Sequence, residues 1–250
     1  MPHCITFTAD DLGLNEPTNL AIERAHQRGV LNAASLMMGQ LGSSHALEVI
    51  GRNPELEIGW HFHACDSRPL TRARWPWGTS PHLAGLAVAL LPSARSLVRR
   101  ELQAQWAAFL ATGVRCRFLN GHHHLHIHPW IARQMHECVQ TAFTGWVRGF
   151  KVALLAGSSL RRLGYRLLRQ RSDEWLSIWW PQPRTDTLWG LDRTFRMNAD
   201  EVQQVLPTLG EGHHEFLFHP RAHDDCDQRA LIELRHAGAS RPRNPLSLSP

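Results

Sequence analysis

Cys4-Ile-Thr-Phe-Thr-Ala-Asp-Asp-Leu-Gly13 is the stretch that decides the fold of this chain. Its first six residues are apolar and β-branched, which predicts a buried strand that stops at Asp10 and Asp11. In α/β folds the carboxyl ends of the strands meet at one rim, where the following loops carry the chemistry. Two adjacent carboxylates repel each other there, so a cation or a shared proton is expected to stabilise them. A turn that caps the next helix is the alternative.

Further strand-like segments also end at polar side chains. Leu56-Glu-Ile-Gly-Trp-His-Phe-His63 ends at two histidines, Val114-Arg-Cys-Arg-Phe-Leu119 leads into a histidine cluster, and Glu215-Phe-Leu-Phe-His219 ends at a third site. Residues 17–28 predict a helix that closes at Gly29, and residues 33–38 predict a second strand. The order strand, helix, strand is that of a βαβ unit. The chain therefore predicts an α/β fold with chemistry at four strand ends.

The histidine cluster is Asn120-Gly-His-His-His-Leu-His-Ile-His-Pro129, which holds five of the 17 histidines. Imidazole titrates near neutrality and is a common metal ligand, so the cluster indicates metal binding, proton transfer or both. A tag or a solvated loop is the alternative, but the position in mid-chain, before a predicted helix over residues 129–141, argues against a tag. In an extended backbone His122, His124, His126 and His128 would share one face, so we expect only some of them to bind one metal.

Composition sets wider limits. The chain has 250 residues, of which 43% are apolar and 20% charged, an ordinary globular composition. No linker or repeat divides it, so we predict one domain over residues 1–238 and a disordered tail over 239–250. Five cysteines without a CxxC pair argue against a disulfide framework and favour a reducing compartment. Without a signal peptide or a long apolar run, we predict a cytoplasmic protein.

A basic segment suggests a membrane surface. Residues 154–170 alternate leucines with Arg161, Arg162 and Arg166, and Trp175-Leu-Ser-Ile-Trp-Trp180 follows. Such a helix and tryptophan patch favour peripheral contact with the inner membrane face or a lipid substrate. A surface helix docked on the core is the alternative. The net charge of +5 agrees weakly with an anionic partner. No nucleic-acid-binding motif is present, so no nucleic-acid partner is expected.

The strand-end residues suit one chemistry. One carboxylate and two imidazoles can hold a divalent ion and leave positions open for water and substrate. A second carboxylate beside them can take a proton from the attacking water, and a further histidine can protonate the leaving group. These parts indicate metal-assisted hydrolysis of an amide or an ester.

Four motifs resemble those of the YdjC-like carbohydrate deacetylases. They are Thr8-Ala-Asp-Asp-Leu-Gly-Leu14, Gly59-Trp-His-Phe62, the histidine cluster and Phe218-His-Pro220, and their order and spacing cover residues 5 to about 238. Within that family, Gly29-Val-Leu-Asn-Ala-Ala-Ser-Leu-Met37 and Ala111-Thr-Gly113 resemble the hopanoid-biosynthesis-associated branch called HpnK.

The resemblance implies a distorted (β/α) TIM-like barrel that removes an N-acetyl group from an acetamido sugar with one divalent metal ion, magnesium or zinc. It implies that Asp11, His61 and His122 are the metal ligands and that Asp10 is the general base for the attacking water. It also implies that His219 is the acid or the oxyanion stabiliser.

The resemblance further implies that Arg148, His124 and His126 contact the substrate. In the HpnK branch that substrate is an N-acetylglucosaminyl hopanoid glycolipid, and the products are acetate and a free amino sugar. A soluble chito-oligosaccharide deacetylase is the first alternative. A non-catalytic metal- or sugar-binding protein on the same fold is the second, and no oligomeric state is predicted.

Three positions depart from the family pattern. Leu12 replaces the usual phenylalanine, a hydrophobic swap expected to alter packing more than chemistry. His63 has no family counterpart, so it either competes for metal or lines the pocket. The segments after Glu233 are short, which questions whether the barrel closes.

Overall fold

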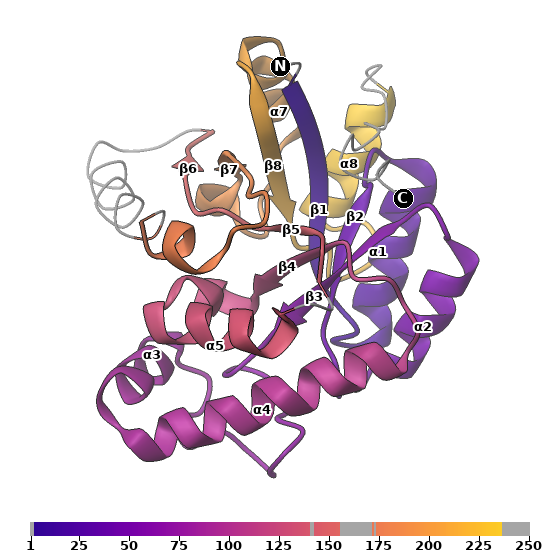
Figure 1. Cartoon of the computed structure of the whole chain (residues 1–250). Helices are drawn as coiled ribbons and strands as arrows, with labels where there is room; N and C mark the ends of the chain where they lie inside the picture. Colours follow the sequence, from indigo (N-terminus) through magenta and orange to yellow (C-terminus); the bar gives the residue numbers. More distant parts are fainter. Residues whose placement is uncertain (1–2, 141–142, 156–171, 173, 237–250) are drawn as a thin grey trace.

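The structure is a computed structural model of the chain, and it describes residues 3–140, 143–155, 172 and 174–236 (Figure 1). In these residues eight parallel strands form one curled sheet in the order β5-β4-β3-β2-β1-β8-β7-β6. This arrangement confirms the predicted single-domain α/β fold of the distorted TIM-like barrel type. The strands are β1 (His3–Leu12), β2 (Ala33–Leu36), β3 (Glu57–Phe62), β4 (Phe118–Gly121), β5 (Trp146–Val147), β6 (Val152–Ala153), β7 (Thr187–Trp189) and β8 (Gly212–Phe218).

Helices connect the strands and cover the outside of the sheet (Figure 1). They are α1 (Glu16–Arg28), α2 (Ser43–Arg52), α3 (Pro81–Leu90), α4 (Pro92–Ala111), α5 (Pro129–Val139), α7 (Ala199–Val205) and α8 (Cys226–His236), with the 3-10 turns η1 (His122–Ile127), η3 (Leu191–Arg193) and η4 (Leu206–Thr208). Helix α1 closes at the predicted Gly29, for a packing reason: a Cβ there would lie 2.6 Å from the carbonyl oxygens of Ala25 and Leu231.

A short connection joins the β5 edge of the sheet to the β8 side. Val147 forms a parallel bridge with Arg184, and its N–H donates to the carbonyl of Pro183 at 2.9 Å. Two residues later, the N–H of Asp186 donates to the carbonyl of His213 on β8 at 2.8 Å. The segment before β7 therefore bridges β5 and β8.

Several boundaries differ from the sequence prediction. The spacing of Leu102, Trp106 and Phe109 predicts a helix over residues 101–112, but α4 begins nine residues earlier, because Pro92 occupies its first turn, where a missing N–H costs nothing. The apolar run over residues 83–91 is compatible with either a helix or a loop in the sequence, and it lies largely in α3. The strand predicted over 114–119 is β4, Phe118–Gly121, and the short strands β6 and β7 were not predicted.

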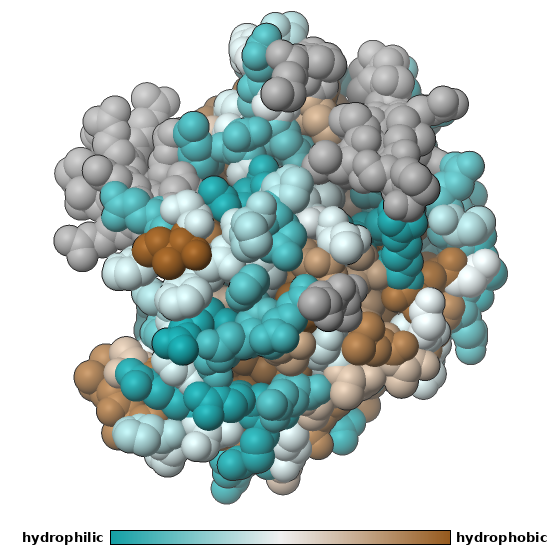
Figure 2. Space-filling view, in the orientation of Figure 1, coloured by the Kyte–Doolittle hydropathy of each residue, from teal (hydrophilic) through white to brown (hydrophobic). Residues whose placement is uncertain are grey.

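Helix α3 is unusual because, apart from His82, its side chains are apolar and yet many of them are exposed. Figure 2 shows hydrophobic surface at the lower left, where Figure 1 has α3. Within the described residues no single helix has the length and apolar composition to cross a bilayer; α3 and α4 pass that test only as a pair bent by 114°.

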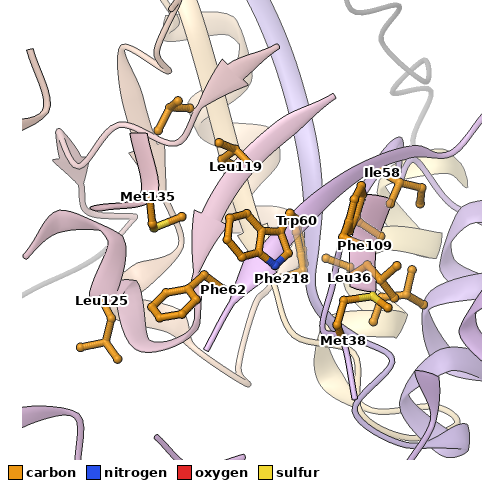
Figure 3. Packing of buried hydrophobic residues seen from close by; sticks show 14 of the residues in the cluster. Leu36, Met38, Ile58, Trp60, Phe62, Phe109, Leu119, Leu125, Met135 and Phe218 are labelled. Carbon is orange, nitrogen blue, oxygen red and sulfur yellow. The ribbon is translucent and has the colours of Figure 1, made fainter. Parts of the chain in front are cut away.

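The main core lies between the sheet and the helices α4 and α5. Trp60, Phe62, Phe109 and Met135 are fully buried there (Figure 3), and the rings of Trp60 and Trp106 have centroids 5.1 Å apart. Leu12 is also fully buried in this core.

The predicted tryptophan patch is only partly exposed. Leu176 and Trp180 are buried in the core, whereas Trp175 is 38% exposed, so the interfacial interpretation is wrong for Trp180. The basic helix predicted from residue 154 to 170 and the tail 239–250 lie wholly or largely outside the described residues.

Candidate active site

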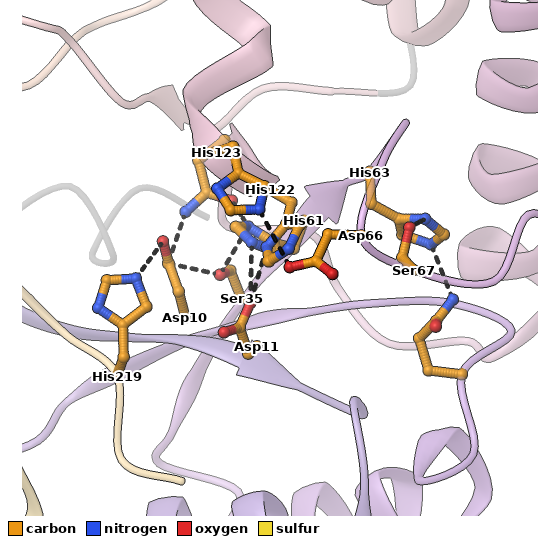
Figure 4. A network of polar contacts seen from close by, with 12 residues as sticks. Asp10, Asp11, Ser35, His61, His63, Asp66, Ser67, His122, His123 and His219 are labelled. Atoms are coloured by element: carbon orange, nitrogen blue, oxygen red, sulfur yellow. Dashed lines mark hydrogen bonds and ion pairs between the residues drawn. The ribbon is translucent and has the colours of Figure 1, made fainter. Parts of the chain in front are cut away.

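Three of the predicted residues converge at the carboxyl end of the sheet. Asp11 lies near the end of β1, His61 on β3, and His122 at the first position of η1, directly after β4 (Figure 4). All three are buried. Asp11 Oδ1 is 3.0 Å from His122 Nδ1 and 3.5 Å from His61 Nε2. The site therefore joins residues that are far apart in the sequence.

A bulge in β1 lets both aspartates reach the site. Adjacent residues of a regular strand point to opposite faces. Between Ala9 and Leu12, however, the register with β2 shifts, and Asp11 has a φ of 70°, in the left-handed region. Residues other than glycine rarely adopt this backbone conformation. Bulges of this kind change the direction of a side chain next to an active site. The predicted strand therefore does not stop at Ala9 but continues through the bulge to Leu12.

The three side chains fit a divalent ion. Ligand atoms about 2.0–2.2 Å from a common ion lie about 3.0–3.5 Å from one another at octahedral or tetrahedral angles. The two distances from Asp11 Oδ1, 3.0 Å to His122 Nδ1 and 3.5 Å to His61 Nε2, match this spacing. Asp11 Oδ1, His61 Nε2 and His122 Nε2 are buried and have no hydrogen-bond partner among the described residues. Buried unpaired atoms are costly unless something binds them. One carboxylate and two imidazoles thus form a group that can hold a metal.

The tautomer of His61 follows from its neighbours. Asn120 donates from Nδ2 to Asp10 Oδ1 at 3.0 Å, so its Oδ1 is the acceptor that faces His61 Nδ1 at 2.6 Å. His61 must therefore carry a proton on Nδ1, which leaves the Nε2 lone pair directed toward Asp11. Burial lowers the pKa of His61, but Asp10 and Asp11 outweigh it and raise the pKa, so the site attracts positive charge.

Asp10 is held by four donors. Arg148 donates to both of its oxygens at 2.6 and 2.9 Å, and Ser35 and Asn120 donate to Oδ1 at 2.7 and 3.0 Å. Burial alone would raise the pKa of Asp10, but the Arg148 guanidinium and His61 hold it well below the usual range. Asp10 is therefore an ionised carboxylate of fixed orientation.

Arg148 lies directly after β5, fully buried between two carboxylates. Besides Asp10, it contacts Glu215 on β8, to which Nε and Nη2 donate at 3.0 and 2.7 Å. The guanidinium of Arg148 thus hydrogen-bonds to Asp10 and Glu215, and it orients the carboxylate of Asp10. The substrate contact predicted for Arg148 stays a prediction.

His219 follows β8 and lies on the other side of Asp10, with Nε2 at 4.0 Å from Asp10 Oδ2. Its backbone N–H donates to Asp227 Oδ2 at 2.6 Å, which fixes the loop. Burial lowers the pKa of His219 to about 4, despite the carboxylates of Asp10 and Asp11. The imidazole is therefore neutral near pH 7.

Two unpredicted residues form the edge of the site. Arg221 donates to Asp11 Oδ2 at 3.1 Å, and its guanidinium lies 4.1 Å from the ring centroid of Phe195. Phe195 is 45% exposed, has a φ of 62°, and its ring also contacts that of His219. An exposed aromatic ring held in a strained conformation beside the site is suited to contact a ligand.

The rest of the histidine cluster is not extended. His123 and His124 have φ values of 50° and 57° within the 3-10 turn, so the one-face arrangement considered for an extended backbone is wrong. His126 is buried with Nε2 3.2 Å from the carbonyl oxygen of Arg148, and burial lowers its pKa to about 3. His124 is also neutral, because burial and Arg148 lower its pKa. Their predicted substrate contacts stay predictions.

His63 lies outside the group Asp11, His61 and His122. Its Nε2 is 3.0 Å from the carbonyl oxygen of Met38, and its Nδ1 is 2.8 Å from Ser67 Oγ. Burial lowers its pKa to about 3. Of the two expectations for His63, competing for metal and lining the pocket, these contacts favour a structural part of the pocket wall.

Sequence reasoning missed the residues that orient the site, although two gave a signal. Ser35 lies inside the otherwise apolar strand β2, and Glu215 directly precedes the apolar end of β8; a buried polar residue needs a partner. Arg221 and Asp227 gave no such signal, because they lie in polar segments near the C-terminal helix.

Comparison with known proteins adds a family. Residues 4–243 match the family described as YdjC-like protein. A carbohydrate deacetylase of Vibrio campbellii is 33% identical over 134 residues, which is 50% of this chain and 51% of the relative. One from Geobacillus stearothermophilus is 33% identical over 129 residues, 52% and 53% of the two chains. The chain thus spans about half the length of these curated relatives.

A solved structure from Enterococcus faecalis V583, titled as a candidate cellobiose-phosphate cleavage protein, has the same fold. It superposes with a TM-score of 0.64 at 16% identity, over 93% of this chain and 92% of the other. At this identity the likeness concerns the fold alone.

Proposed function

Because this chain belongs to the YdjC-like family, we propose that it is a metal-dependent carbohydrate N-deacetylase. The observation that carries the proposal is the convergence of Asp11, His61 and His122, whose possible ligand atoms lie within 4.8 Å of one another. Of these, Asp11 Oδ1 and His61 Nε2 are buried and have no hydrogen-bond partner among the described residues. The name carbohydrate deacetylase, borne by relatives that match half of the chain, supports the reaction class.

In the proposed reaction, Asp11, His61 and His122 hold one divalent ion, magnesium or zinc. Such an ion polarises the amide carbonyl and lowers the pKa of a water molecule. Asp10 accepts the proton of the attacking water. Its four donors keep the carboxylate in one orientation, and this preorganisation is the role we assign to Arg148, Ser35 and Asn120.

His219 acts from the opposite side of Asp10. With its pKa lowered to about 4, the imidazole is neutral near pH 7 and donates a hydrogen bond from one ring nitrogen. Two roles were predicted for His219, acid and oxyanion stabiliser. A neutral imidazole favours stabilisation of the oxyanion over direct proton donation. The products are acetate and a free amine on the sugar.

For the substrate, we propose an N-acetylglucosaminyl glycolipid of the hopanoid type, with peripheral contact at the inner membrane face. The HpnK-like motifs Gly29–Met37 and Ala111–Gly113 support this choice. A soluble chito-oligosaccharide is the alternative. Acetate release from diacetylchitobiose, measured beside release from N-acetylglucosaminyl glycolipids in detergent, separates the two substrates.

The test of the reaction is acetate release from a panel of N-acetylated glycans and glycolipids, before and after chelation. We expect chelation to stop release and added magnesium or zinc to restore it. Asp10→Asn keeps the shape of the side chain but removes the base, so it should bind metal and release no acetate. A chain that binds zinc by calorimetry yet deacetylates no member of the panel would instead be the non-catalytic binding protein.

A further inference from the structure

The face formed by α3 and the start of α4 has a composition that a free surface rarely carries. Helix α3 reads Pro-His-Leu-Ala-Gly-Leu-Ala-Val-Ala-Leu and has no charged side chain. A helix that is apolar all round is normally buried in a core or in lipid. Here only Ala84 and Val88 are buried, on the side that faces the protein.

The outer side of α3 is a row of exposed leucines. Leu83, Leu86 and Leu90 recur at the spacing of one helix face and are 54%, 55% and 67% exposed, and Leu91 continues the row at 51%. Together with Leu97 of α4 they line a groove of about 640 Å³. A contiguous exposed apolar patch of this kind marks a site of interaction.

The charges around the groove are of one sign. From Ser67 to Arg100 the sequence contains six arginines and no aspartate or glutamate. Arg72 and Arg100 line the groove itself and are exposed. Neither forms a salt bridge with any residue that the structure describes. Exposed leucines bordered by unpaired arginines match the apolar interior and the anionic headgroups of a lipid surface.

The loop that carries Arg72 is held in position. The buried carboxylate of Glu101 accepts the backbone N–H groups of Leu70 and Thr71 at 2.6 and 3.0 Å. Farther along, Trp77 Nε1 donates to the carbonyl of Ala64 at 2.6 Å. The carboxylate of Glu101, next to Arg100 in sequence, is thus turned inward, and Arg72 and Arg100 are exposed without a salt bridge to any described residue. The positive charge belongs to an ordered surface.

This face adjoins the candidate active site. Ala64 follows the strand end that carries His61, and a Cβ at Gly85 of α3 would lie 3.8 Å from the ring of His128, at the end of the histidine turn. A surface docked on α3 would therefore bring its headgroups to the rim of the sheet where the site opens.

We propose that the face formed by Leu83, Leu86, Leu90, Leu91, Arg72 and Arg100 docks the protein on the surface of an anionic lipid bilayer. The leucines enter the boundary of the acyl chains and the arginines contact lipid phosphates. The inference extends the glycolipid part of the proposed function, but binding to lipid needs no turnover, so the two can fail separately.

The test is co-sedimentation of the full chain with phosphatidylcholine vesicles, with and without phosphatidylglycerol. We expect binding only to the anionic vesicles, and weaker binding in high salt. The L83Q/L86Q/L90Q variant should lower the partition coefficient about 100-fold, since three partly buried leucines are removed from lipid. The R72Q/R100Q variant should lower it roughly 30-fold. Circular dichroism and thermal melts check that both variants fold.

The matched controls are leucines exposed elsewhere. L20Q on α1 and L110Q at the far end of α4 change side chains that are 53% and 48% exposed, and they should bind as the unaltered protein does. Acetate release from a water-soluble substrate should be equal in all these variants, because none of the changed residues contacts the site. A general loss of release would count against the proposed function and not against the docking face.

Three results would overturn the inference. The first is no binding of the unaltered chain to anionic vesicles. The second is that the L83Q/L86Q/L90Q variant binds anionic vesicles as strongly as the unaltered chain, and that binding is lost only when the charges of Arg161, Arg162 and Arg166 are reversed. The third is self-association on gel filtration that the leucine variant abolishes, without vesicle binding, which would identify a second copy of the chain as the occupant.

Discussion

Replacing Arg148 by methionine tests whether the buried charges organise the site. The guanidinium makes four hydrogen bonds to two buried carboxylates, at 2.6 and 2.9 Å to Asp10 and at 2.7 and 3.0 Å to Glu215. Removing one partner of a buried ion pair costs about 3–5 kcal/mol, because it leaves a buried charge uncompensated. We expect Arg148→Met to lower the free energy of unfolding by that amount.

The contacts also indicate which of the two carboxylates loses more stabilisation when Arg148 is replaced. Asp10 keeps its hydrogen bonds from Ser35 and Asn120, whereas Glu215 Oε2 has no hydrogen-bond partner in the described part of the chain. Most of the cost should therefore come from Glu215. Adding Glu215→Gln to Arg148→Met neutralises it, and the loss in the double variant should be smaller than the sum of the two single losses by about 2 kcal/mol.

Urea unfolding, monitored by tryptophan fluorescence, gives the free energy of unfolding of the unaltered protein, the two single variants and the double variant. Equal m-values show that the four proteins unfold comparably. The reasoning is refuted if Arg148→Met costs less than about 1 kcal/mol, or if the two changes add to within about 0.5 kcal/mol, the behaviour of independent sites. Acetate release should fall in Arg148→Met even where the protein remains folded, because Asp10 loses two of its four donors.

Three further predictions concern residues around the site. Asn120→Ala removes the acceptor of His61 Nδ1 and should weaken zinc binding about 10- to 100-fold by calorimetry; unchanged affinity would contradict the assigned tautomer. Burial raises the pKa of Asp227 to about 6, so the native state holds the extra proton, and this group alone contributes up to about 3 kcal/mol of stability that is lost as pH rises from 4 to 6. The difference in unfolding free energy between the unaltered protein and Asp227→Asn should change by that amount across this range in urea unfolding, and a constant difference would rule the assignment out. Phe195→Ala should raise KM for the sugar several-fold with little change in kcat, and the reverse pattern would exclude a substrate contact.

The sequence predicted the parts of the fold that depend on local pattern. Alternating or apolar runs revealed β1, β3 and β8, and their polar ends identified Asp10, Asp11, His61 and His219 before any contact was known. The strands β6 and β7 have two and three residues, too few for a period to be recognised. Their formation depends on neighbouring strands and not on their own residues.

Contacts between distant residues set the limit for the site. Arg148 and Glu215 are 67 positions apart, and Asp10 and Arg148 are 138 apart, so no spacing rule could join them. The density of the histidine cluster drew attention to the correct strand end but not to its geometry. Two left-handed residues in succession, His123 and His124, turn the chain so that His122 alone of the cluster joins Asp11 and His61 in one group.

The different roles proposed for Asp10, as base, and Asp11, as metal ligand, follow from their hydrogen bonds. The two residues are chemically identical and adjacent, yet Asp10 accepts from four donors while Asp11 Oδ1 has no hydrogen-bond partner within the described residues. A carboxylate whose lone pairs are already occupied is a poor ligand for an ion, and one with a free, buried oxygen facing two imidazoles is a good one. The bulge at Asp11 brings this side chain to the same site as Asp10, where it faces the two imidazoles and not the donors that hold Asp10. In a straight β1 the side chain of Asp11 would point to the opposite face, so a change that straightens the strand should remove the role of Asp11 as a ligand without altering any charge.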